Sequence, residues 1–333
     1  MPSWNKVRDE IHSESIHDSV RRRHLRELHE LTGRNVIAYY SGWMEKEYLI
    51  RAGLTGVEVN DSDKNGFMAT IHELDRTLGL DLILHTPGGD VAATESLVDY
   101  LRTMFGTDIR VIVPQLAMSA GTMIALSAKG VLMGKHSSLG PIDPQSNGLA
   151  CHSVVAEFER AKREIAADPS TIAVWQPIIA KYPPTFISEC ENAIEWADSM
   201  VQKWLETGMF ADCDDPPKRA RAVLDKLGSH YETLAHSRHI SAEYVKNLGI
   251  RVDMLEEEPA LQEAVLTVHH AYVQTLTETP AFKIIENHNG VAFISAAQLA
   301  FSGTTPTVAP VSATPPAEAV MEELPLNNSK QDG

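Results

Sequence analysis

Short apolar stretches alternate with helix-like stretches between residues 82 and 133, and this alternation limits the possible folds more than any other feature of the sequence. The apolar stretches are too short for helices and are typical of buried strands: residues 82–85, 109–113 and 130–133. Between the first two of them, Leu97, Leu101 and Met104 lie at helical spacing. Strands that alternate with helices predict an α/β fold with a parallel, buried sheet.

The rest of the chain divides into regions with different patterns. A first strand is expected at residues 35–40, and helices at 15–33, 64–78, 91–105, 119–128, 151–167, 185–206, 216–228, 241–248 and 258–276. The end of the chain is rich in Pro, Thr, Ala and Glu, so it cannot bury enough apolar surface to offset the entropy of ordering. We therefore expect an N-terminal helical segment over 1–34, a strand-helix domain over 35–255, a C-terminal helical extension over 256–301 and a disordered tail over 302–333.

Charge and cysteine content narrow the function and the compartment. The 45 acidic and 29 basic side chains give a formal net charge of −16, which disfavours binding to nucleic-acid phosphates or anionic lipid. The three cysteines have no Cys-x-x-Cys spacing, which predicts neither a disulfide framework nor a zinc knuckle and fits a reducing cytoplasm. The charged N-terminal stretch and the lack of an apolar run of about 18 residues predict no signal peptide and no membrane span.

Two loops carry the residue types that acyl transfer needs. The segment Thr86-Pro87-Gly88-Gly89 interrupts the chain after one strand, and Met118-Ser119-Ala120-Gly121 follows the next strand. The carboxyl ends of parallel strands meet at one edge of a sheet, so we expect both loops in one crevice. Glycines allow backbone N–H groups to approach a substrate closely, and a serine at a strand-to-helix turn has an exposed hydroxyl. Either motif alone is typical of a simple turn, but their order and context predict a nucleophile with an oxyanion hole.

These segments resemble the Clp-fold serine peptidases. Residues 84–89 are similar to the Pro-Gly-Gly loop of ClpP, and residues 117–122 to its nucleophile turn; Gly140-Pro141-Ile142-Asp143-Pro144-Gln145 continues the likeness. The similarity is greatest to the serine dehydrogenase proteinases, relatives of the signal peptide peptidase SppA, and covers about residues 80 to 150. It implies a ClpP/crotonase-like fold over residues 35–255. It also implies Ser119 as the nucleophile, with N–H groups of Gly88 or Gly89 and of Ala120 as the oxyanion hole.

The general base departs from the ClpP pattern. The position at which ClpP has its catalytic histidine is occupied by Asp143. The resemblance to SppA favours a Ser-Lys dyad with Lys181 as the base, since a lysine can act as a base when its neutral form is stabilised. The resemblance to the serine dehydrogenase proteinases allows instead a Ser-His-Asp triad with His236 or His239 as the base and Asp143 as the orienting acid.

The expected function is ATP-independent hydrolysis of peptide bonds through an acyl-enzyme, acting on a peptide or protein substrate. Two alternatives stay open: a crotonase-like acyl-CoA hydratase or isomerase, and an inactive Clp-fold scaffold or peptide-binding protein. By analogy with Clp-fold proteins we expect a homo-oligomer.

No cofactor or metal is expected. The run Asp61–Gly66 matches the first half of an EF-hand loop, but its twelfth position is His72 rather than glutamate, so the run is interpreted as a helix-opening turn. The glycines after Thr86 lack dinucleotide-loop spacing, and no Walker lysine follows them, which argues against NAD and ATP.

Overall fold

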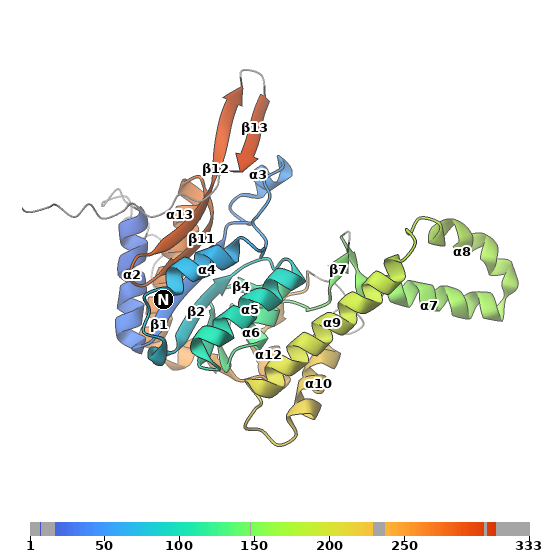
Figure 1. Ribbon diagram of the computed structural model, residues 1–333, viewed down its shortest axis with the longest axis horizontal. Coiled ribbons are helices and arrows are strands. Elements are labelled where there is room, and N and C mark those ends of the chain that lie inside the picture. The colour runs from blue at the N-terminus through green and yellow to red at the C-terminus, as the bar shows by residue number, and fades with distance from the viewer. Residues whose placement is uncertain (1–6, 8–16, 147, 229–236, 303–304, 311–333) are drawn as a thin grey trace, which may run out of the picture.

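A large twisted sheet runs through the molecule (Figure 1). The structure is a computed structural model, and it describes residue 7 and residues 17–146, 148–228, 237–302 and 305–310. The eight strands have the order β10-β5-β3-β2-β1-β11-β12-β13. Their bounds are β1 (Asn35–Ser41), β2 (Leu80–His85), β3 (Ile109–Val113), β5 (Gly130–Met133), β10 (Val252–Met254), β11 (Ala281–Asn287), β12 (Ala292–Ser302) and β13 (Thr305–Pro310).

The pairing of these strands confirms the predicted α/β fold with a parallel core. Neighbouring strands from β10 to β1 pair in parallel, whereas β11, β12 and β13 continue the sheet as antiparallel strands. In β2, Leu82 and Leu84 face one apolar cluster and Ile83 faces another. This period of two buries the strand on both sides, as a parallel sheet between helices requires.

Helices cover the two faces of the sheet. On one face lie α2 (His17–Thr32) and α13 (Pro259–Glu278). The other face carries α4 (Asp63–Ile71), α5 (Val91–Phe105), α6 (Ala120–Leu126), α9 (Phe186–Thr207), α10 (Pro216–Leu227) and α12 (Ala242–Asn247) (Figure 1). Shorter elements connect them: α3 (Glu47–Arg51), η1 (Arg76–Leu78) and η3 (Leu255–Glu257).

Two small sheets lie at the carboxyl edge of the main sheet. The first joins β4 (Leu116–Ala117), β6 (Ser138–Leu139) and β9 (Ile240–Ser241). The second is a hairpin of β7 (Gln145–Ser146) and β8 (Leu149–Ala150). Together they hold segment 138–146 beside the turn that contains Ser119.

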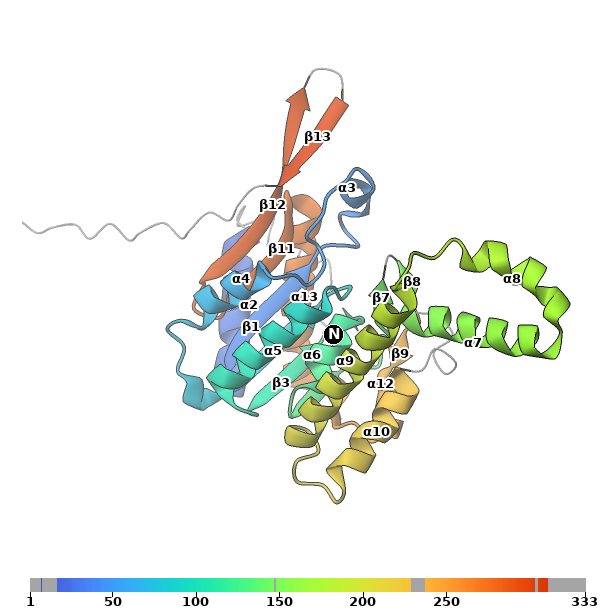
Figure 2. The same cartoon turned by 45° about the vertical axis from the view of Figure 1, so that its right-hand side comes forward.

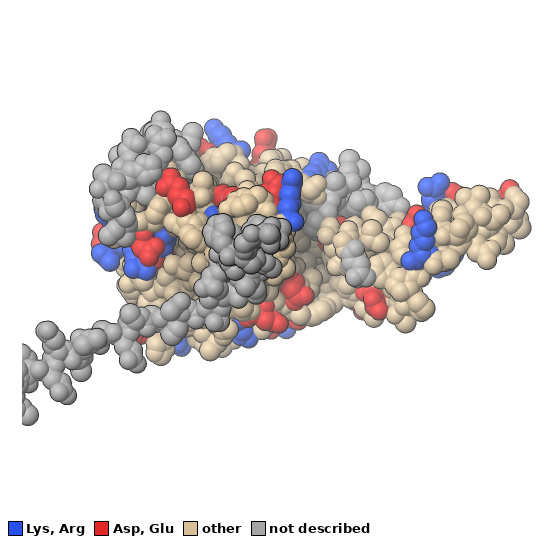
Figure 3. Space-filling view, turned by 90° about the horizontal axis from the view of Figure 1, so that it is seen from above, with Lys and Arg blue, Asp and Glu red and all other residues tan. Residues whose placement is uncertain are grey.

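A helical arm projects from the body of the protein (Figures 1 and 2). It consists of α7 (Cys151–Ala167), η2 (Pro169–Thr171), α8 (Ile172–Ile179) and the first turns of α9. Cys151, Val154 and Phe186 belong to the small apolar core at its base. The helix α8 contains no charged residue, and most of the surface at the end of the arm is neither acidic nor basic (Figure 3).

The C-terminal region differs from its prediction. A helical extension was expected over 256–301, but after α13 the chain adds β11 and β12 to the sheet, and Thr305–Pro310 of the expected disordered tail forms β13. Lys283 and Glu286 break the apolar run of β11, so the sequence pattern hides a strand that is buried along its whole length. Residues 311–333, the rest of the expected tail, lie outside the described residues.

None of the described helices is long and apolar enough to cross a membrane.

Candidate active site

Ser119 has an unusual backbone conformation. It lies between β4 and α6 with φ 50° and ψ −114°, in a region that residues with a side chain rarely occupy. The turn is held on both sides. The N–H of Met118 donates to the carbonyl of Thr86 at 3.0 Å, and the Thr122 hydroxyl donates to the carbonyls of Ala117 and Gly140 at 2.9 Å each. Surrounding hydrogen bonds therefore stabilise the strained residue.

The Pro-Gly-Gly loop packs against this serine, and side chains would not fit in it. Gly88 has φ +101°, and a Cβ atom added to it would lie 2.6 Å from the Cβ of Ser119. A Cβ atom on Gly89 would lie 2.3 Å from the backbone nitrogen and oxygen of Val59. Glycine is therefore required at both positions. At Gly88 the positive φ and the closeness of Ser119 exclude a side chain, and at Gly89 the backbone of Val59 leaves no space for one.

Two backbone N–H groups next to Ser119 are available to a ligand. The N–H of Gly88 donates to the Thr86 hydroxyl at 3.2 Å. Val59 donates to the carbonyl of Gly88 at 2.8 Å and accepts from the N–H of Asp90 at 2.9 Å. These two hydrogen bonds flank Gly89, and neither of them uses the Gly89 N–H. Within the described part of the chain, no hydrogen bond uses the N–H of Gly89 or of Ala120. These two donors flank the serine, as an oxyanion hole requires.

Ser119, Gly88, Gly89 and Ala120 line one cavity of about 490 Å³. Three carboxylates line it as well: Glu58, Asp90 and Glu189. Apolar side chains form another part of the wall: Met123, Ala193 and Trp196. None of the described residues in the lining is a lysine, arginine or histidine. The cavity combines an exposed hydroxyl and unused N–H donors with an acidic and apolar wall.

Over residues 10–289 the chain matches the family described as ClpP-like SDH-type serine proteinase. The chain belongs to this family. The match confirms the resemblance to Clp-fold peptidases that the two loops indicated. It identifies the group as serine proteinases, and the parallel sheet agrees with a ClpP-like fold.

Two archaeal proteins of Methanocaldococcus jannaschii are similar to this family member. The uncharacterized protein MJ0137 is 36% identical over 230 residues, which cover 68% of this chain and 71% of that protein. The uncharacterized protein MJ1495 is 28% identical over 233 residues, which cover 70% of this chain and 71% of that protein.

Two of the candidate bases, Lys181 and His239, are not among the described residues that line the cavity. Lys181 is exposed in the turn between α8 and α9 on the arm. His239 is exposed just before β9, and His236 lies outside the described residues. Their catalytic roles stay predictions.

Asp143 lies buried in the loop beside the nucleophile turn. Only 1% of its surface is exposed, and the preceding Gly140 packs against Ser119: a Cβ atom on it would lie 3.1 Å from the Ser119 nitrogen. Burial, with the neighbouring Cys190 and Asp143, raises the pKa of the Cys151 thiol to about 12. Cys151 is therefore protonated at neutral pH and is a poor nucleophile.

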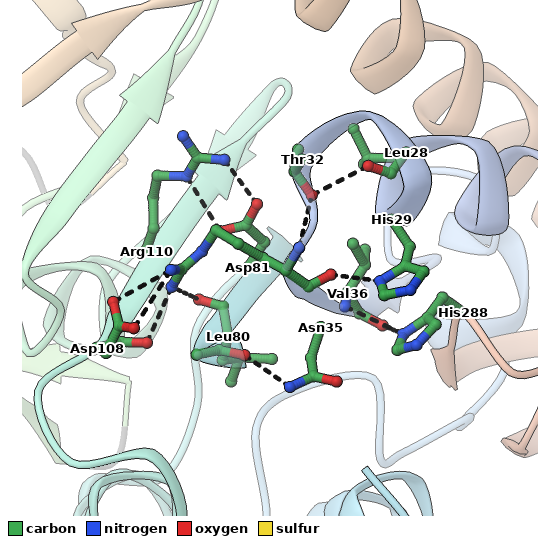
Figure 4. A network of polar contacts seen from close by, with 12 residues as sticks. Leu28, His29, Thr32, Asn35, Val36, Leu80, Asp81, Asp108, Arg110 and His288 are labelled. Atoms are coloured by element: carbon green, nitrogen blue, oxygen red, sulfur yellow. Dashed lines mark hydrogen bonds and ion pairs between the residues drawn. The ribbon is translucent and has the colours of Figure 1, made fainter. Parts of the chain in front are cut away.

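A second cavity, of about 500 Å³, lies at the opposite, amino edge of the sheet. Asp81, fully buried in β2, accepts hydrogen bonds from Arg34 at 2.7 Å and from Arg110 at 2.6 Å (Figure 4). Lys129 follows the end of α6, and Lys246 lies in the last turn of α12. A cation in the last turn of a helix offsets the helix dipole, and Lys246 has this position in α12.

Glu58, Glu189 and Trp196 also line the Ser119 cavity, and no sequence pattern predicted them there. Glu58 lies in the loop before α4, and Glu189 and Trp196 lie about two turns apart on α9. No local motif marks them, because each reaches the cavity only through the packing of its element against the carboxyl edge.

Proposed function

We propose that this protein is an ATP-independent serine peptidase in which Ser119 attacks the peptide carbonyl and forms an acyl-enzyme. The observation that carries the proposal is the strained conformation of Ser119 against the backbone of Gly88, at a cavity with two unused N–H donors. Serine nucleophiles at strand-to-helix turns have this type of conformation. The N–H groups of Gly89 and Ala120 would bind the oxyanion that forms when Ser119 adds to the carbonyl.

Lys181 is proposed as the general base, delivered by the arm of a neighbouring copy in a homo-oligomer. No described residue of the lining has a basic side chain, which supports a base that another part of the assembly supplies. The exposed turn that carries Lys181 follows the apolar helix α8, on which Ile172 is 46% and Val174 63% exposed. In this arrangement the apolar part of the wall would stabilise the neutral form of the lysine that a general base requires, and the carboxylates would oppose that effect. The alternative base is His236 or His239 with Asp143.

The cavity wall argues against an acyl-CoA substrate. Coenzyme A carries several phosphate charges, and the described residues of the lining include three carboxylates and no cation to bind them. A peptide, which is neutral along its backbone, is compatible with this wall.

The proposal is tested by labelling the full chain with a fluorophosphonate probe. We expect covalent labelling at Ser119, identified by peptide mass spectrometry, and its loss in Ser119→Ala. Absence of labelling in the wild type would favour the scaffold alternative and contradict the peptidase.

The base is tested by matched lysine variants. Lys181→Ala should lose about 10³-fold or more in labelling rate because nucleophile and base act as a unit. Lys162→Ala is the control, since Lys162 is exposed on α7 and ion-paired with Glu159. A mixture of Ser119→Ala and Lys181→Ala proteins should recover labelling if the base comes from another copy. Loss of labelling in His236→Ala or His239→Ala, with Lys181→Ala active, would assign the base to histidine.

A further inference from the structure

Lys283 is a buried charge that the proposed reaction does not use. It lies on β11 and only 1% of its surface is exposed. Its ammonium group donates to both carboxylate oxygens of Asp63, at 2.8 and 3.1 Å, and to the carbonyl of Glu58 at 2.7 Å. Burial lowers the pKa of Lys283, and the carboxylate of Asp63 opposes this shift. A buried ion pair costs desolvation energy, so this pair need not stabilise the fold.

The partner carboxylate joins three elements. Asp63, 1% exposed, begins α4 and also accepts hydrogen bonds from the Tyr39 hydroxyl of β1 at 2.8 Å and from the N–H of Asn60 at 3.0 Å. Lys283 and Asp63 therefore hold segment 58–60 at two backbone atoms, the Glu58 carbonyl and the Asn60 N–H.

The same segment supports the oxyanion loop. Between the two held atoms, Val59 accepts from the N–H of Asp90 at 2.9 Å and donates to the carbonyl of Gly88 at 2.8 Å. On the other side of the loop, the Thr86 hydroxyl accepts the N–H of Gly88 at 3.2 Å. A continuous set of contacts thus runs from Lys283 to the peptide groups beside Ser119.

We propose that Lys283, Asp63 and Tyr39 are positioning residues that hold the loop Pro87–Asp90 in the geometry that binds an oxyanion. The inference rests on the proposed peptidase function. None of the three residues lines the Ser119 cavity, so each acts through segment 58–60 and its residue Val59. An oxyanion hole stabilises charge only when its donors are placed before reaction, and a displacement of about 1 Å can cost about 10²-fold in rate.

A matched control exists on the other face of the same strand. Glu286 of β11 is fully buried and binds Arg21 at 3.0 Å and the Tyr272 hydroxyl at 2.8 Å. This group also combines a carboxylate, a cation and a tyrosine, but it faces α2 and α13. It makes no described contact with the Pro-Gly-Gly loop.

The experiment compares Lys283→Met with Arg21→Met in the full chain. We expect the labelling rate of Ser119 with a fluorophosphonate, per folded molecule, to fall about 10²-fold in Lys283→Met and to stay near wild type in Arg21→Met. Hydrogen exchange of peptides spanning residues 86–91 should rise in Lys283→Met only. Wild-type rate and exchange in Lys283→Met, or equal losses in both variants, would overturn the inference.

A milder pair of variants tests the same inference if Lys283→Met or Arg21→Met does not fold. Tyr39→Phe and Tyr272→Phe each remove one hydroxyl that donates to a buried carboxylate. With an activated ester, Tyr39→Phe should lower kcat about tenfold with KM unchanged, because the oxyanion contacts form only in the transition state. Equal kcat in the two variants would contradict the positioning role. Hydrogen exchange can be measured without activity, so it separates the two proposals. If the wild type is not labelled but exchange over residues 86–91 still rises in Lys283→Met, the peptidase function is refuted and the loop contacts are supported.

Discussion

The two edges of the central sheet are built differently although the same strands form both. At the carboxyl edge, Ser119 has a strained backbone and the N–H groups beside it have no described partner. At the amino edge, the buried carboxylate of Asp81 is paired by Arg34 and Arg110, with hydrogen bonds of 2.6 to 3.0 Å (Figure 4). The carboxyl edge thus carries the strained serine and the unused donors beside it, and the amino edge carries the paired charges of Asp81 and its two arginines.

This difference shows how a single sheet can carry function and stability without conflict. Groups that must bind a developing charge have to stay unpaired in the free protein, which is unfavourable for folding. At the opposite edge, the charges of Asp81, Arg34 and Arg110 are paired. Substitutions at the two edges should therefore affect different measurements.

The largest difference between the two edges is expected from glycine substitutions. Gly89→Ala should lower the rate of Ser119 labelling about 10²–10³-fold, because the new methyl group would meet the backbone of Val59 and displace an oxyanion donor. Gly106→Ala is the control at the amino edge, where φ is +62° but no atom lies within 4 Å of the added Cβ. It should lower the melting temperature and leave the labelling rate unchanged. Similar labelling in both variants would remove the distinction between the edges.

Asp81→Asn should lower the stability of the protein and leave the labelling of Ser119 unchanged. It leaves Arg34 and Arg110 without their buried counter-charge, and we expect a loss of about 3 kcal/mol in the free energy of unfolding. Urea denaturation measures this loss, and labelling per folded molecule should remain at the wild-type rate. A labelling rate of the folded variant that is lower than the wild-type rate would show that the amino edge also affects the geometry around Ser119.

The pH dependence of stability should report His85, the last residue of β2 at the carboxyl edge. Burial lowers its pKa to about 3. Below the unfolded pKa of about 6.5 the unfolded chain binds a proton that the folded chain does not, so stability is lost as pH falls. Between pH 6.5 and 5 this costs about 2 kcal/mol. The buried His269, whose pKa is also lowered, acts in the same direction.

His85→Phe is the test of that contribution. Urea denaturation at pH 7.5 and pH 5 should show a smaller decrease in the variant than in the wild type. An unchanged decrease would assign the pH dependence to other groups.

The smallest effect is expected at the surface of the amino edge. Lys246→Ala removes a cation from the last turn of α12, which should lower the free energy of unfolding by about 0.3–1 kcal/mol at low ionic strength. The loss should disappear at high salt because the charge is exposed. A salt-independent loss would indicate a packing role for this side chain.

Local patterns predicted the parallel strands, the helix α7 to the residue and the serine turn. Each depends on residues that are close in sequence, such as the apolar run of β3 or the paired glycines after Thr86. Strand β11 was missed because its two charged residues are paired only with distant partners, Asp63 and Arg21. The cavity carboxylates Glu58 and Glu189 were missed for a related reason, since each reaches the site through the packing of its element.

The sequence by itself determined the ClpP-like fold and the family, and it predicted the nucleophile and its glycine loop, because periodicity and backbone freedom are properties of short segments. Only the tertiary structure decided which N–H groups stay unused, which side chains form the cavity wall and how Lys283 meets Asp63 across 220 residues. Those features depend on the pairing of β11 with β1 and on the placement of α4 and α9, which bring together groups that no local pattern relates.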